Sequence, residues 1–343
     1  MTHPVHTPVV AADGGLISFA LADLLAGRTT TMRVELSDAG AAEPWLTRLV
    51  GAEASLAALG QGQADLPARP ELGRLALLLW LRRWWPAGPS LGIPSLDPAL
   101  LDLETAVATA DVEDLAEGLL DGFEASPAEL FDAAIADGAL AAAAWPVADD
   151  VRALCVRLAD WFDEQDDVVR AEAAARVETP APSQNTYALA AGLDPVAPGE
   201  GVLASGHASV DWARVPPGIL DAGEDTVTWR IVAAAAATRL EVVVAGAFAD
   251  AAITAFASHE GEPFAEVPLE LGAGRFSGTT DLAETAEHVH SGRITVVVGV
   301  ADEGVAGTTA EDRAEVVALV RARPPESRTL AERAAAASAD EEF

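Results

Sequence analysis

The spacing of apolar residues changes part-way along this chain of 343 residues. Before residue 170, apolar side chains recur every three or four positions, as they do on one face of a helix. After residue 205, apolar and polar residues alternate in short runs such as Val227–Ile231 and Arg239–Val242, which is typical of antiparallel strands. We therefore predict an α+β multidomain protein, in which an N-terminal all-α helical domain is followed by a C-terminal antiparallel β-sandwich-like domain.

Changes in composition set the predicted domain boundaries. We expect a helical domain over 1–170, a linker or long surface loop over 171–205, a β-sandwich-like domain with a closing helix over 206–325, and an acidic flexible tail over 326–343. The linker is indicated by the four prolines between Glu178 and Gly201. Pro268 falls within an alternating run, so its strand is expected at a sheet edge or at a bulge.

The most apolar segment of the helical half is Leu75–Leu81. It is followed by Arg82, Arg83, Trp84, Trp85 and Pro86. A run that is apolar on every face belongs in a protein core, so we expect the central helix here, ended by Pro86. The four residues before Pro86 have two interpretations, the bulky end of a core helix or a partner-binding patch, since Arg and Trp are enriched at binding hot spots. The arginines are expected to pair with internal carboxylates, such as those of a helix over Asp97–Asp121.

The patterns of the other N-terminal segments are weaker. Residues 1–12 are expected to be extended, 15–27 to form a short helix closed by Gly27, 30–36 to form a short strand or an extended segment, and 60–70 to form a loop. The helix over Asp97–Asp121 has one broad apolar face, and its acidic residues, Asp102 and Glu104 among them, are expected mostly on the other face.

The charge of the chain limits its partners. There are 54 acidic and 21 basic residues, which gives a net charge of −33, and every basic residue is Arg. Such a chain is repelled by phosphate backbones and by anionic lipids, so we expect an unknown protein partner and neither nucleic acid nor membrane. The absence of Lys, beside abundant Ala, Gly and Pro, indicates codon usage of a high-GC bacterium. The chain shows neither the charged start of a signal peptide nor a run of about 18 apolar residues, so we expect a cytoplasmic protein.

Residues with catalytic or ligand-binding chemistry are sparse. The sequence has no phosphate-binding loop, dinucleotide fingerprint or nucleophile elbow, so we predict no cofactor and no catalytic residue. His288 and His290 are candidate metal ligands, because residues i and i+2 of a strand share a face, and Glu284 or Glu287 would add a carboxylate. Cys155 lies on the apolar stripe of a helix and is expected to be a small buried hydrophobe.

Three hypotheses for function follow from these observations. The leading hypothesis is a non-enzymatic interaction, scaffold or regulatory accessory protein, because the sequence lacks a catalytic constellation and is strongly acidic. The first alternative is a metal-assisted hydrolase that uses His288 and His290. The second is an acidic mimic of nucleic acid that occupies the groove of a basic protein, whose binding would weaken steeply with salt.

Overall fold

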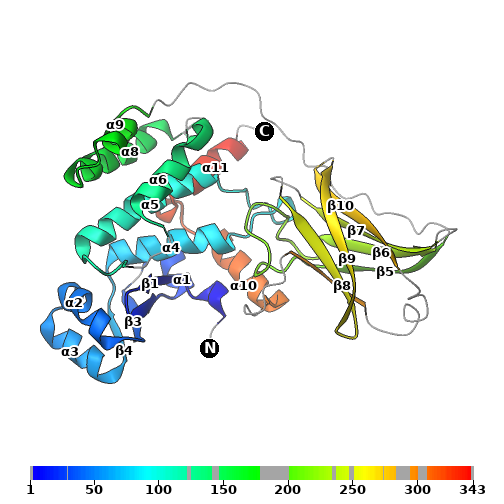
Figure 1. The fold of residues 1–343 in the computed structure, drawn as a ribbon, viewed down its shortest axis with the longest axis horizontal. Helices are drawn as coiled ribbons and strands as arrows, with labels where there is room; N and C mark the ends of the chain where they lie inside the picture. Colours follow the sequence, from blue (N-terminus) through cyan, green and yellow to red (C-terminus); the bar gives the residue numbers. More distant parts are fainter. Residues whose placement is uncertain are drawn as a thin grey trace. The chain divides into compact units, whose positions relative to one another are not determined.

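The computed structural model describes most of the chain, with gaps. The described residues are 3–28, 30–121, 125–140, 147–177, 201–233, 237–246, 251–272, 274–282, 294–299 and 307–340. They form two compact units that are built from separate stretches of the sequence (Figure 1). Unit 1 comprises Met1–Arg83, Leu96–Gln184 and Ala318–Phe343, and unit 2 comprises Trp84–Ser95 and Asn185–Val317.

Unit 1 combines helices with a small sheet. Its helices are α1 (Leu21–Leu25), α2 (Ala39–Val50), α3 (Ala52–Gln61), most of α4 (Pro70–Trp84), α5 (Pro98–Leu115), α6 (Pro127–Ile135), α8 (Ala148–Glu164), α9 (Val168–Ala175) and α11 (Leu330–Asp340). Its strands are β1 (Val9–Ala12), β2 (Gly15–Ser18), β3 (Thr31–Leu36) and β4 (Gln63–Pro67). Short 3-10 turns lie at η1 (Pro4–His6), η3 (Ala136–Gly138) and η5 (Pro325–Ser327).

The prediction that the N-terminal half is all-α is wrong, because β1 to β4 form an antiparallel sheet in that order. Segment 15–27 holds β2 and α1 instead of one helix, 60–70 contains β4 instead of only a loop, and the strand expected over 30–36 is confirmed as β3. The turn between β1 and β2 is Asp13-Gly14, with Gly14 at φ +67°, a conformation that favours glycine in a two-residue hairpin.

The core of unit 1 is built on α4 and α5. Leu75, Leu78 and Leu81 are fully buried, which confirms that the apolar run is a core helix. Helix α5 begins as its sequence predicts, with the Asp97 carboxylate accepting hydrogen bonds from the N–H groups of Ala99 and Leu100. Residues on every side of α5 are buried, so its apolar face is broader than its periodicity indicates.

Unit 2 is dominated by one antiparallel sheet of seven strands. These are β5 (Val202–Ala208), β6 (Val227–Ala233), β7 (Thr238–Ala245), β8 (Ile253–His259), β9 (Glu262–Gly272), β10 (Arg275–Leu282) and β11 (Ile294–Val298), in the order β11-β8-β9-β10-β7-β6-β5. The unit also holds η2 (Pro89–Leu91) and most of α10 (Ala310–Arg321).

The sheet of unit 2 is nearly closed on itself. Its two end strands, β11 and β5, approach each other, so the antiparallel sheet forms a near-barrel instead of the expected sandwich. The strand β9 makes this possible, because it pairs with β8 up to Leu269 and with β10 from Glu270 onward. Pro268 therefore lies next to the point where β9 changes partner, and β9 is an inner strand of the order, not an edge.

The C-terminal segment differs from its prediction. Residues 330–340 form helix α11, with Leu330, Ala331 and Ala334 buried, so the expected flexible tail over 326–343 is wrong for this part. The helix begins with a reciprocal pair of hydrogen bonds between Thr329 and Glu332, which together satisfy backbone N–H groups at its first turn. Among the helices described, none combines the length and the apolar character that a membrane span requires.

Candidate functional site

The segment Arg82–Trp85, predicted as either core or interface, is mostly engaged in internal contacts. Arg82 forms an ion pair with Asp102 on α5 at 2.9 Å, as expected from the sequence. Burial is the main reason that the pKa of Asp102 is raised, and the nearby Arg82 opposes it. Trp84 and Trp85 are buried, and Arg83 is half-buried. These positions favour the packing interpretation for the two tryptophans.

The residues after Trp84 are held within unit 2 by hydrogen bonds. The Trp85 indole donates to the carbonyl of Pro94 at 2.8 Å. The buried carboxylate of Asp221 accepts hydrogen bonds from the Ser90 hydroxyl at 2.8 Å and from the N–H of Gly223 at 2.9 Å. This carboxylate explains why a short segment of the N-terminal half is part of the β unit, which no local pattern in the sequence indicates.

The other candidates from the sequence do not form a site that the structure describes. His288, His290, Glu284 and Glu287 lie outside the described residues, so the metal hypothesis for them stays a prediction. Within the described ranges, no group of three or more His, Cys, Asp or Glu side chains is arranged to hold a metal ion. Cys155 is buried as expected, and burial raises the pKa of its thiol to about 11, which keeps it protonated and unreactive at neutral pH.

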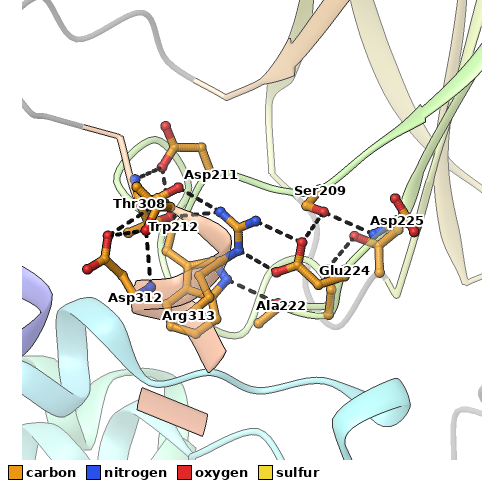
Figure 2. A network of polar contacts seen from close by, with 12 residues as sticks. Ser209, Asp211, Trp212, Ala222, Glu224, Asp225, Thr308, Asp312 and Arg313 are labelled. Carbon is orange, nitrogen blue, oxygen red and sulfur yellow. Dashed lines mark hydrogen bonds and ion pairs between the residues drawn. The ribbon is translucent and has the colours of Figure 1, made fainter. Parts of the chain in front are cut away.

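A polar network in unit 2 joins the start of α10 to the loop before β6 (Figure 2). Arg313 donates two hydrogen bonds to the carboxylate of Glu224, at 2.6 and 2.8 Å, and a third to the carbonyl of Thr308 at 2.7 Å. The Ser209 hydroxyl donates to Glu224 at 2.6 Å. Asp211 accepts hydrogen bonds from the N–H and the hydroxyl of Thr308, at 3.0 and 3.2 Å. The network therefore connects segments that are about a hundred residues apart.

This network resembles a clamp more than a catalytic site. Hydrogen bonds from Arg313 are the main reason that the pKa of Glu224 is lowered. A carboxylate with a lowered pKa is a weak base, so Glu224 is poorly suited to activate the Ser209 hydroxyl. Arg313 is buried and its donors are directed to Glu224 and Thr308, which leaves little capacity for binding an anion. The arrangement fixes the start of α10 to the segment between β5 and β6.

We expect the Glu224 clamp to weaken in acid. Its folded-state pKa lies below the ordinary value of 4.5, so the clamp stabilises the fold above that pH and is lost as the pH falls through the lowered value. Glu224→Gln should lower the stability of unit 2 by about 1 kcal/mol at pH 7, and by less at pH 3, where more of the Glu224 carboxylate is protonated. Hydrogen exchange of β6 and β7 amides measures this, with the exposed Glu266→Gln as control. An equal effect at both pH values would contradict the assignment.

A second polar cluster lies in unit 1, around Glu104. This residue is completely buried, although its place among the acidic residues of α5 predicted an exposed side chain. Its carboxylate accepts hydrogen bonds from the N–H groups of Leu330 at 2.9 Å and Ala331 at 3.0 Å, and from Arg74 at 3.1 Å. Burial is the largest influence on Glu104 and raises its pKa, against these hydrogen bonds.

The same cluster holds a buried ion pair. Arg323 and Glu332 lie 2.8 Å apart, with side chains only 1% and 5% exposed. Burial lowers the pKa of Arg323 and raises that of Glu332, so for both residues the loss of hydration outweighs the attraction between them. The Nε atom of Arg323 has no hydrogen-bond partner among the described residues. The cluster therefore fixes the position of α11 at a considerable electrostatic cost.

Sequence reasoning missed both clusters, although part of the signal is present. The spacing Thr329–Glu332 is a capping-box pattern that marks the start of a helix. The contacts of Glu104, Glu224 and Asp221 depend instead on residues far away in the chain, so no local pattern reveals them.

No protein-family model, curated protein or solved structure matches this chain.

Proposed function

We propose that this protein is a non-enzymatic interaction protein, a scaffold or regulatory accessory factor, whose acidic surface binds a cationic protein partner. The observation that carries the proposal is the large excess of negative charge. Of the 21 basic residues, at least fourteen already form ion pairs with carboxylates of the chain itself. Most of the 54 acidic residues therefore have no cation to neutralise them.

The end of helix α8 shows this excess most clearly. Asp160, Asp163, Glu164 and Asp166 are exposed, and no ion pair joins them to any residue in the described part of the chain. Carboxylates are unfavourable at a helix C-terminus, because the helix dipole is negative there. Cationic side chains from a partner would relieve this repulsion, and long-range attraction would speed the association of the two proteins.

The interior of the near-barrel supports binding at the surface. The described side chains that gather inside the sheet are apolar and buried. They include Val227, Ile231, Leu240, Val242, Val244, Ala255, Val267 and Phe276. A sheet whose interior is filled by its own side chains resembles a small packed barrel more than a ligand-enclosing one. We therefore assign the binding role to the outer surface.

A native pull-down with mass spectrometry on the full chain tests the proposal. We expect it to retain cationic proteins, and we expect the complexes to dissociate as salt is raised from about 50 mM to about 500 mM, where the Debye length falls below about 5 Å. Retained partners without a basic bias, in complexes that survive high salt, would overturn the proposal. If nucleic acid competes for the same partner, the protein acts as an acidic mimic of nucleic acid.

The acidic end of α8 provides a sharper prediction. Replacing Asp160 and Asp163 with Asn, Glu164 with Gln and Asp166 with Asn should weaken partner binding about tenfold at low salt, because each exposed charge contributes a few tenths of a kcal/mol. A control variant removes four exposed charges that lie singly on separate elements. They are Asp23, Glu43, Glu53 and Glu266. The control should lose less than about threefold.

The enzyme alternative has its own test, since its residues lie outside the described ranges. Stoichiometric zinc or manganese in the untagged protein, lost in His288→Ala, would favour a metal-assisted hydrolase over the interaction protein. Absence of metal, together with unchanged folding of the double variant His288→Ala/His290→Ala, would remove that alternative.

A further inference from the structure

Helix α11 has little apolar surface with which to attach itself to unit 1. Leu330 is its only large apolar residue, and its other apolar residues are alanines. Of these side chains, Leu330, Ala331 and Ala334 are buried. Its C-terminal residue Asp340 is followed in the sequence by Glu341 and Glu342, and acidic residues at a helix C-terminus oppose the helix dipole. Apolar burial alone therefore holds this helix weakly.

Polar contacts provide the remaining attachment, and they are concentrated at the first turn of α11. The Glu104 carboxylate accepts hydrogen bonds from the N–H groups of Leu330 and Ala331, and the Thr329 hydroxyl accepts one from the N–H of Glu332 at 3.3 Å. All three N–H groups at the start of the helix are therefore satisfied, two of them by one side chain of α5. The Glu104 carboxylate therefore helps to set the position where α11 meets α5, beside the buried Arg323–Glu332 ion pair and the ion pair of Arg333 with Asp150 on α8.

We propose that α11 is a releasable C-terminal cover on helix α5, and that Glu104 is the latch that sets how often the cover opens. Release separates the Glu104 carboxylate from the two N–H groups of α11 and uncovers a carboxylate and apolar surface on α5. Unit 1 would then present a surface that the closed state hides. This inference does not depend on the partner proposed above, because it concerns an equilibrium within unit 1.

Charged and titratable groups around Glu104 make the release of α11 depend on pH. The pKa of Glu104 is influenced by Arg74 on α4 and by Glu332 on α11. The pKa of Glu332 is influenced in turn by Arg323 and Arg328, which lie between α10 and α11. Burial raises the pKa of both glutamates in the closed state. The closed state consequently binds protons more tightly than the open state does, and opening increases as the pH rises through the raised values.

Native-state hydrogen exchange of the full chain at several low urea concentrations tests the latch. We expect the amides of residues 333–338 to be at least about a hundredfold less protected than those of residues 103–110, with an opening that depends only weakly on urea. Glu104→Gln keeps one acceptor but turns donor hydrogens toward the second N–H of α11. It should lower the protection of α11 about tenfold further and leave α5 and α8 unchanged.

The matched control is Asp102→Asn, which makes the same chemical change on α5 but at the partner of Arg82. It should leave the exchange of α11 unchanged. The proposal is overturned if α11 in the unmodified protein exchanges only together with α5, or if Glu104→Gln loosens α5 and α11 equally. The comparison of α11 with α5 in the unmodified protein needs no variant, so it tests the release of α11 even if Glu104→Gln fails to fold.

Discussion

Replacing Arg323 with methionine is expected to destabilise unit 1 by about 3–5 kcal/mol, which is the usual effect of removing one partner of a buried ion pair. Arg323 is 4% exposed, and its removal would leave the buried Glu332 carboxylate without its ion-pair partner. Urea denaturation followed by the helical far-UV circular dichroism measures the effect, since most of the described helices belong to unit 1. A loss below about 1 kcal/mol would contradict it.

The double variant Arg323→Met/Glu332→Gln gives this prediction a demanding control. Glutamine can keep the reciprocal hydrogen bonds with Thr329, and methionine can fill much of the volume of the arginine. Because burial disfavours the charge of both native residues, neutralising the pair should recover most of the lost stability and could exceed the native value. A double variant as unstable as Arg323→Met would show that the attraction within the ion pair stabilises α11. The loss in Arg323→Met would then not come only from burying an unpaired carboxylate.

Gly278→Ala is expected to destabilise unit 2 by about 2–3 kcal/mol, because a Cβ atom at this position would lie 2.2 Å from the carbonyl oxygen of Pro268. Backbone atoms cannot give way as a flexible side chain can. The clash occurs where β9 passes from β8 to β10, so the variant tests the arrangement that nearly closes the sheet. Protection of β7 amides against hydrogen exchange measures the loss.

The matched control is Gly272→Ala, in the same region of the sheet. A Cβ atom there would meet no other atom within 4 Å, so the change should be within about 0.5 kcal/mol of neutral. If the two alanine variants were equally stable, β9 would not cross β10 closely at Pro268.

Much of the fold follows from local patterns. The change from a helical to an alternating period separates the helices around Leu75–Leu81 from the strands of the near-barrel. The excess of acidic residues predicts that Arg82 pairs with an internal carboxylate, and the structure pairs it with Asp102 on α5. The hairpin at Asp13-Gly14 has the dipeptide that favours such turns, yet its strands are only four residues long, too short for alternation to be clear.

The sequence alone specifies the types of most secondary elements, because hydrophobic periodicity and capping are properties of neighbouring residues. It also determined that the protein carries far more negative than positive charge. The tertiary structure, in contrast, places Glu104 in the interior, since its partners Leu330 and Ala331 lie more than two hundred residues further along the chain. It likewise decided that Asp221 binds Ser90, since a carboxylate's environment is set by whatever the fold brings to it and not by its neighbours in sequence.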